Sequence, residues 1–203
     1  MSEPITIYGD AGSGNCLKVR WVADHLGIPI VWRYVDVPSG QTRSPEMLAL
    51  NPAGRVPFAV FGNGEVLSES NAIILHLAEG SALVPAAALS RARMLQWMFW
   101  EQYSHEPYIA VRRYQLHYLK RSPADLDPRL EERGADALAL MQGNLGRSAY
   151  MVGDALSLAD LALVAYTRMA HEGGFDLAPY PAVRAWVARV EAGLGIGPYA
   201  GPR

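Results

Sequence analysis

The order of the elements in the first eighty residues constrains the fold most. An apolar run at residues 5–8 predicts a strand, and apolar residues then recur at i, i+3, i+4 and i+7 from Val19, which marks one face of a helix. Gly27 and Pro29 end that helix, and the β-branched and aromatic run at residues 30–37 predicts a second strand. A strand, a helix of about a dozen residues and a second strand form a crossover unit. The two strands are therefore expected to be parallel, with a right-handed connection.

The next forty residues predict an antiparallel end to the same sheet. A short helix is expected near Glu46 to Leu50, after a polar loop. Asn63-Gly64 lies between two apolar stretches, and this pair favours a hairpin with a type I′ turn because both residues tolerate positive φ. The segment from Ser70 to Gly80 then predicts a helix that ends at glycine.

From about Ser90 the sequence has only helical periods. We predict an α/β domain at residues 1–80, a linker at 81–89 and an all-helical domain at 90–203. The clearest helix start is at Ser157, which can form a capping box with Asp160, while Leu156 and Leu161 can form the hydrophobic staple.

Charge and cysteine content exclude several classes of function. The formal charge of −2 gives no electrostatic reason to expect a nucleic acid or an anionic membrane as partner. The single cysteine, Cys16, excludes an intrachain disulfide and a cysteine-based metal cluster, and we expect no metal site. No charged leader precedes an apolar core at the N-terminus, and no run approaches the roughly 18 apolar residues of a membrane span, so a cytoplasmic location is expected.

The glycine-rich stretch "GDAGSGNCLK" (residues 9–18) lies where the first strand gives way to the helix. A phosphate loop would need Lys and Ser/Thr where Asn15 and Cys16 stand, and a dinucleotide fingerprint would need Gly or Ala at Leu17. The remaining local interpretation is a turn in which Ser13 or Asn15 caps the helix.

Several motifs occur in an order that resembles a known family. These are "SGNCLKVR" at the first helix, "NPAGRVP" before the hairpin, "SESNAI" after it and "SLADL" in the helical region. Together with the order βαβαββα followed by helices, they resemble the cytosolic glutathione S-transferases, in particular the bacterial serine-type, theta/nu-like members. The resemblance implies a thioredoxin-like N-terminal domain with a mixed sheet that binds glutathione as a cosubstrate, with no tightly bound cofactor. It also implies an all-α C-terminal domain, a small apolar electrophile as second substrate, a homodimer and a role in detoxification.

In serine-type members a serine at the start of the first helix donates a hydrogen bond to the glutathione sulfur, and Ser13 matches it. A thiol titrates near pH ~8.5, so only a few per cent is thiolate at neutral pH. Backbone N–H groups at a helix start and a hydroxyl donor both favour the anion. Lowering the thiol pKa by about two units, worth roughly 2.7 kcal/mol, would make most of it thiolate. Ser13 is thus expected to stabilise a nucleophile that the cosubstrate carries.

Two other residues compete with Ser13 for this role. Asn15 stands at the spacing of an asparagine in some bacterial relatives, and its amide N–H could reach the same sulfur, but it could also be a plain helix cap. Tyr8 lies near the end of the first strand, where other classes of the family place a catalytic tyrosine, or it is a packed aromatic. Members that use cysteine carry it where Ser13 stands, so Cys16 is expected to be buried and unreactive.

The resemblance assigns the rest of the glutathione site to three segments. It implies a cis peptide bond before Pro57, which leaves the Val56 backbone to pair with the cysteinyl unit. Glu69 is expected to bind the γ-glutamyl ammonium, and Ser70 and the helix that follows to bind its carboxylate.

The glycine end departs from the family pattern. The family's histidine and lysine are replaced by the stretches Gln41-Thr42-Arg43 and Gly54-Arg55. Arg55 is the first choice for the glycine carboxylate because of its bidentate fork, with Gln41 or Thr42 assisting. A solvated surface arginine is the alternative.

The aromatic segment at residues 96–119 predicts the walls of the electrophile pocket. Tyr103, Tyr108 and Arg112 are the candidates there, together with Tyr8 from the first strand, although aromatics at helical spacing are often core residues. His105, His117 and His171 have no metal spacing and are expected to be structural or exposed.

The sequence leaves three functions open. The first is transfer of the glutathione thiolate to an apolar electrophile. The second is a glutathione-dependent disulfide reductase or peroxidase, and the third is a non-catalytic binding protein that keeps the transferase fold.

Overall fold

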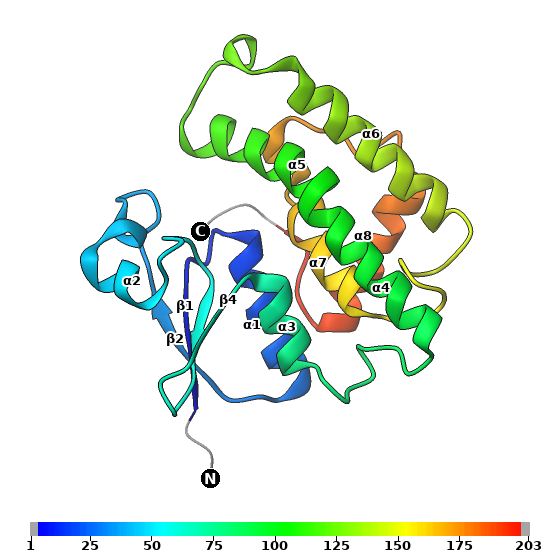
Figure 1. Ribbon diagram of the computed structural model, residues 1–203. Coiled ribbons are helices and arrows are strands. Elements are labelled where there is room, and N and C mark those ends of the chain that lie inside the picture. Colours follow the sequence, from blue (N-terminus) through cyan, green and yellow to red (C-terminus); the bar gives the residue numbers. More distant parts are fainter. Residues whose placement is uncertain (1–3, 200–203) are drawn as a thin grey trace. The chain divides into compact units, whose positions relative to one another are not determined.

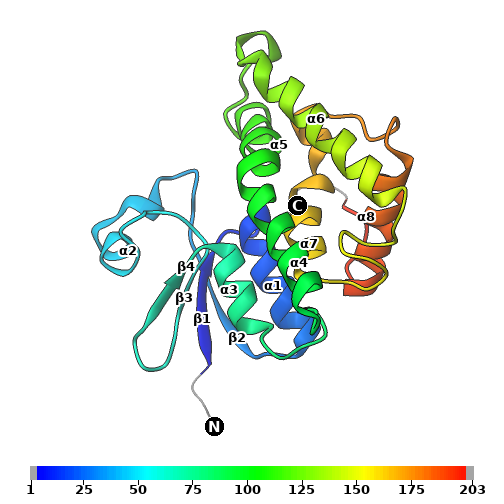
Figure 2. The same cartoon turned by 45° about the vertical axis from the view of Figure 1, so that its right-hand side comes forward.

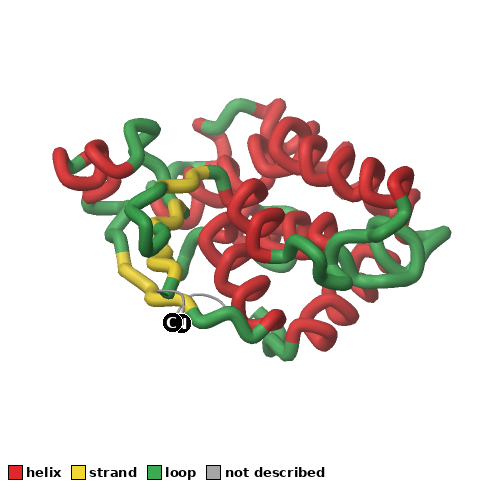
Figure 3. Tube along the Cα trace, turned by 60° about the horizontal axis from the view of Figure 1, so that its bottom comes forward, coloured by secondary structure: helices red, strands yellow, loops and turns green. Residues whose placement is uncertain are grey.

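The computed structural model describes residues 4–199, which fall into two compact units, Met1–Ser81 and Ala82–Arg203. The elements of the first unit are β1 (Ile5–Gly9), α1 (Gly14–Leu26), β2 (Ile30–Tyr34), α2 (Pro45–Leu50), β3 (Phe58–Val60), β4 (Val66–Ser68) and α3 (Ser70–Leu77). Those of the second are α4 (Ala88–Trp100), α5 (Glu106–Arg113), α6 (Pro128–Leu145), α7 (Leu158–Thr167) and α8 (Pro181–Leu194). All of these strands belong to the first unit, as the colouring in Figure 3 shows.

The sheet of the first unit has the order β2-β1-β3-β4. β1 and β2 are parallel, with Ile7 opposite Trp32, whereas β3 runs antiparallel to both β1 and β4. This confirms the crossover unit and the antiparallel end. α1 and α3 lie together on one face of the sheet and α2 lies on the other (Figures 1 and 2). The fold class is therefore the predicted one, a thioredoxin-like mixed sheet followed by a helical unit.

The hairpin turn differs from the prediction. Gly64 has φ +84°, but Glu69 and Lys120 are the only non-glycine residues with positive φ among residues 4–199, so Asn63 does not have the conformation of a type I′ turn. Instead Gly64 N–H donates to Phe61 C=O (2.8 Å), and Phe61 N–H donates to Glu65 C=O (2.9 Å). The loop is thus one residue longer, a β-turn followed by a left-handed glycine, which needs only one residue with positive φ.

The core of the first unit forms where α1 and α3 meet the sheet. Ile7, Val19, Ala59 and Ile73 are all fully buried there. Gly9, the last residue of β1, lies so close to Trp32 that an added Cβ would come within 2.8 Å of its ring. A glycine is therefore needed at the point where β1 turns toward α1.

The second unit is built around α7, in which every residue from Leu158 to Thr167 is buried. α4, α5 and α8 pack against it. The predicted capping box is present, and Ser157 donates to Asp160 Oδ2 through both its N–H and its hydroxyl (2.9 Å each). Asp160 Oδ1 also accepts from Met151 N–H and Trp186 Nε1–H (2.8 Å each). One buried carboxylate therefore joins the start of α7 to α8.

Candidate active site

The loop between β1 and α1 is shaped by Asp10. Its carboxylate accepts from Gly12 N–H (2.7 Å) and its C=O accepts from Ser13 N–H (3.1 Å). Ser13 is the N-cap residue of α1, with extended backbone angles (φ −87°, ψ 121°), and its side chain makes no capping hydrogen bond. The half-buried hydroxyl is thus held at the positive end of α1 without being used to cap it.

Cys16 lies one turn into α1 and is fully buried. Asp10 N–H donates to its sulfur (3.4 Å). Burial raises the pKa of the Cys16 thiol to about 11, although the Ser13 hydroxyl and the Asp10 N–H act in the opposite direction. The thiol is therefore protonated at neutral pH, and its burial was predicted from the sequence.

Asn15 and Ser70 bring two of the sequence motifs into contact. Ser70 is the first residue of α3 and is 5% exposed, and its hydroxyl donates to Asn15 Oδ1 (3.4 Å). These residues are 55 positions apart in the chain. The starts of α1 and α3 therefore share one polar cluster within the first unit.

Glu69 precedes α3 in a strained backbone conformation, with φ +70° and ψ 113°. A residue with a Cβ in such a region costs on the order of 1–3 kcal/mol, and such strain concentrates at functional sites. The Glu69 side chain is exposed and does not cap α3. An acidic residue in a strained backbone conformation thus immediately precedes the buried Ser70.

The loop before β3 is held by Asn51, which is 5% exposed. Its amide donates to Arg55 C=O (2.9 Å) and accepts from Ala53 N–H (3.2 Å). The Val56–Pro57 peptide bond is cis, as the resemblance implied. Within residues 4–199 the main-chain N–H and C=O of Val56 make no hydrogen bond, so both polar groups remain available.

The residues expected at the glycine end do not play equal parts. Gln41 uses its side-chain oxygen to accept from Asp36 N–H (2.7 Å), which closes its own loop. Thr42 is half-buried beside it, and Arg55 is exposed. Sequence reasoning missed Arg43, whose side chain lies against Gly54 (an added Cβ there would come within 2.8 Å of Cδ), next to Arg55 in the chain. Two guanidinium groups therefore come from neighbouring loops.

Tyr8 is packed against Phe58, the residue opposite it on β3. The rings are stacked, with centroids 4.6 Å apart and planes 6° from parallel. The sequence left two interpretations of Tyr8 open, a packed aromatic and a hydrogen-bond donor to the thiolate. This contact favours the packed aromatic.

A cavity of about 470 Å³ lies in the helical unit. Trp100, Tyr103 and Tyr108 line it from α4, α5 and the π-helical turn between them, Glu101–His105, and Leu140 faces them from α6. Arg133 and Asp136, also of α6, carry opposite charges in its wall (3.6 Å). Trp100 lies in the aromatic segment that was expected to form the pocket walls, but it was not singled out, because aromatics at helical spacing are often core residues. π-Helical turns are frequent at functional sites.

Arg112, predicted to line the electrophile pocket, does not line this cavity. Its side chain is 7% exposed, and its guanidinium donates to Gly173 C=O (2.7 Å) and pairs with Glu131 (2.9 Å). His105 is also buried, with a ring nitrogen 2.9 Å from Thr167 Oγ1. Both side chains join helices of the same unit.

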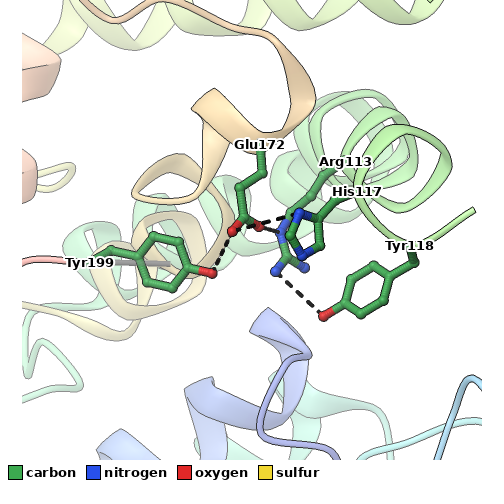
Figure 4. A network of polar contacts seen from close by, with 5 residues as sticks. All are labelled: Arg113, His117, Tyr118, Glu172 and Tyr199. Atoms are coloured by element: carbon green, nitrogen blue, oxygen red, sulfur yellow. Dashed lines mark hydrogen bonds and ion pairs between the residues drawn. The ribbon is translucent and has the colours of Figure 1, made fainter. Parts of the chain in front are cut away.

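A buried polar network holds the C-terminal segment (Figure 4). Glu172 accepts from Arg113 Nε (2.5 Å) and from the Tyr199 hydroxyl (2.8 Å), and His117 Nδ1 lies 3.9 Å from the same carboxylate. Burial lowers the pKa of the Arg113 guanidinium, but the neighbouring Tyr118 and Glu172 raise it above its usual value. Arg113 therefore stays charged, and the network ties Tyr199 to α5.

Two classes of feature were not found in residues 4–199. No helix in this range is long and apolar enough to cross a membrane. No group of histidine, cysteine, aspartate and glutamate side chains in the same range is arranged to hold a metal ion.

Comparisons with known proteins agree across both units. Residues 12–79 match the family model "Glutathione S-transferase, N-terminal domain", and residues 98–193 match "Glutathione S-transferase, C-terminal domain". Glutathione S-transferase 3 of Zea mays is 32% identical, over 93% of this chain and 90% of its own length. A crystal structure of a glutathione S-transferase from Pseudomonas fluorescens is 44% identical, with a TM-score of 0.88 over 93% of this chain and 94% of its own. Another from Xanthobacter autotrophicus is 46% identical, with a TM-score of 0.87 over 93% of each chain.

Proposed function

The chain belongs to the glutathione S-transferase family, and we propose that it transfers the glutathione thiolate to a small apolar electrophile while the Ser13 hydroxyl donates a hydrogen bond to that thiolate. The observation that carries this proposal is the Ser13 hydroxyl, placed at the positive end of α1 and not used to cap it. Charge-assisted hydrogen bonds to a thiolate are about twice as strong as neutral ones. The Ser13 hydroxyl therefore lowers the pKa of the glutathione thiol, so that the thiolate nucleophile is present at neutral pH. We assign this chain to the serine-type, theta/nu-like members on the same residue.

The tripeptide is proposed to lie along three segments of the first unit. The unpaired main chain of Val56 supports β-like pairing with the cysteinyl unit, beside Pro57. Glu69 and Ser70 support binding of the γ-glutamyl end. Arg55 takes the glycine carboxylate, with Arg43 as a second cation and Thr42 or Gln41 assisting.

The electrophile is proposed to bind against Tyr103 and Tyr108 in the cavity of the helical unit. Three aromatic rings and a leucine give it mainly apolar walls, which suit an apolar substrate. Tyr8 remains a proposed contact of the electrophile. The engaged guanidinium of Arg112 makes it a weaker candidate than the tyrosines.

We further propose a homodimer. Leu89 and Phe99, both on α4, are 64% and 71% exposed. We propose that a second copy of the chain covers these large apolar side chains, because exposed apolar surface is typical of protein interfaces. A role in detoxification and a cytoplasmic location stay predictions from the sequence.

Substitution Ser13→Ala tests the proposal. We expect turnover with a model aryl halide to fall by about one to two decades, because the hydrogen-bond donor to the glutathione thiolate is removed. Ser13→Thr keeps a hydroxyl and should retain most of the activity. Glutathione binding, measured by calorimetry, should persist in both variants. Unchanged turnover in Ser13→Ala would assign the hydrogen bond to the thiolate to Asn15 or Tyr8 instead. If the unaltered protein shows no binding heat at millimolar glutathione, every function proposed here is contradicted.

The reductase or peroxidase alternative uses the same thiolate. Turnover of a mixed disulfide or an organic hydroperoxide above that of aryl halides would favour it.

A further inference from the structure

The hydrogen bond between Ser70 and Asn15 uses the single proton of the Ser70 hydroxyl. The Ser70 hydroxyl donates it to Asn15 Oδ1 across 3.4 Å, and the Ser70 side of the contact is buried, with Ser70 5% exposed. A serine hydroxyl has one proton and can donate one hydrogen bond at a time. Ser70 therefore cannot donate to Asn15 and to a ligand in the same state.

The proposed glutathione site needs that same proton. In the proposed function, on which this inference rests, the Ser70 hydroxyl donates to the carboxylate of the γ-glutamyl unit. A bond to a carboxylate is charge-assisted and stronger than a bond to an amide oxygen. The Ser70 hydroxyl therefore donates to the carboxylate when the ligand is bound, but its hydrogen bond to Asn15 must first be broken.

We propose that Asn15 acts as a positioning residue that competes with glutathione for the Ser70 proton. Before glutathione binds, Asn15 holds the hydroxyl and fixes the start of α3 against the start of α1. Binding of the γ-glutamyl carboxylate displaces Asn15 from Ser70. Asn15 thereby weakens the affinity for the ligand and links occupation of the γ-glutamyl end to the turn that carries Ser13.

This competition predicts an effect of unusual sign. Removing the acceptor at Asn15 should improve binding at the Ser70 end, because the competing bond is lost. Because the bond is long, at 3.4 Å, we expect its loss to change Kd by about two- to fivefold, which is the lower part of the range for one intramolecular hydrogen bond. A residue that only supports the local structure would weaken binding when removed.

The test uses the sulfur-free tripeptide γ-glutamyl-alanyl-glycine, which keeps the carboxylates and the ammonium and removes any contact of Asn15 with sulfur. Its Kd is measured by calorimetry for the unaltered protein, Asn15→Ala, Ser70→Ala and the double variant. We expect Asn15→Ala to bind about two- to fivefold more tightly and Ser70→Ala to bind more weakly. In the double variant the gain from Asn15→Ala should disappear, because no proton is left to compete for.

Two further variants control the experiment. Asn15→Leu keeps the branched shape of the side chain without an acceptor and should reproduce the gain if Asn15→Ala folds poorly. Asn63→Ala removes an asparagine in the exposed hairpin and should leave the Kd unchanged. Weaker or unchanged binding in both Asn15 variants, or a gain that persists without the Ser70 hydroxyl, would overturn the proposal. If the unaltered protein binds glutathione but Asn15 shows no competition, only this inference fails; if it binds neither peptide, the proposed function fails with it.

Discussion

Glu69 combines backbone strain with a charge in one residue. Its φ of +70° is unfavourable for any residue with a Cβ, and its carboxylate is the proposed partner of the γ-glutamyl ammonium. Strain and ligand binding can be separated by substitution, because glycine removes both the Cβ and the charge whereas alanine removes only the charge.

We therefore predict that Glu69→Gly is more stable than Glu69→Ala by about 0.5–1 kcal/mol, because relief of the strain exceeds the extra entropy that glycine loses on folding. Both variants should lose affinity for glutathione by a similar factor. Urea unfolding and calorimetric titration measure the two effects. Equal stability of the two variants would mean that the backbone at Glu69 carries no strain.

The buried thiol of Cys16 should make the stability of the protein depend on pH. Its pKa in the folded protein, about 11, lies above that of a cysteine in the unfolded chain, so the folded protein holds the proton more tightly. The associated stability is fully present below about pH 8 and is lost as pH rises through 9 to 11. We expect the free energy of unfolding to fall over this range by up to about 2–3 kcal/mol more than in Cys16→Ala. Parallel pH profiles of the two proteins would show that Cys16 does not contribute.

Among the elements, α7 depends most on one side chain. Asp160 accepts four hydrogen bonds from donors at the start of α7, in the preceding turn and on α8. A buried donor left without an acceptor costs about 1–3 kcal/mol. The carboxylate thus stabilises tertiary structure as well as the helix start.

We predict that Asp160→Ala lowers the free energy of unfolding of the helical unit by at least about 3 kcal/mol, or prevents its folding. Asp154→Ala, at an exposed position in the preceding turn, is the matched control and should change it by less than about 0.5 kcal/mol. Tryptophan fluorescence, to which Trp186 beside Asp160 contributes together with the other tryptophans of the chain, follows the transition in urea. A small effect in both variants would show that the cap is dispensable.

The elements also show what the sequence can and cannot predict. The first strand, the stop of α1 at Gly27 and the capping box follow from local residue types, and each was confirmed. The helix stop predicted at Gly80 was wrong, because α3 already ends at Leu77, and the second strand ends at Tyr34, three residues earlier than predicted. The turn at Asn63 was predicted wrongly because asparagine and glycine suit two loop lengths, and the choice between them depends on which strand residues pair across β3 and β4.

Contacts in the site fall outside local patterns altogether. The bond between Asn15 and Ser70 spans 55 residues, and Arg43 reaches Gly54 from a different loop. The residue types at these positions were readable from the sequence, but their pairing depends on how α1, α3 and the loops pack in three dimensions. The roles proposed for Ser13, Arg55 and the pocket tyrosines stay predictions.

At the scale of the whole molecule, the exposed apolar side chains of α4 give a test of the proposed dimer. Phe99 is 71% exposed, and a buried charge in its place would have no partner across a symmetric interface. We expect Phe99→Glu to sediment as a monomer at concentrations at which the unaltered protein is a dimer. Leu119→Glu, at a 48% exposed leucine outside α4, should remain dimeric. A dimer that survives Phe99→Glu would place the interface elsewhere.

The complete burial of α7 has a consequence for measurement. Its backbone N–H groups are shielded on every side, so their exchange with deuterated solvent requires the helical unit to open as a whole. The slowest-exchanging amides of residues 158–167 should therefore report the global stability of that unit, with no denaturant added. Comparing their exchange rates before and after glutathione is added would reveal how much of the binding energy reaches the helices.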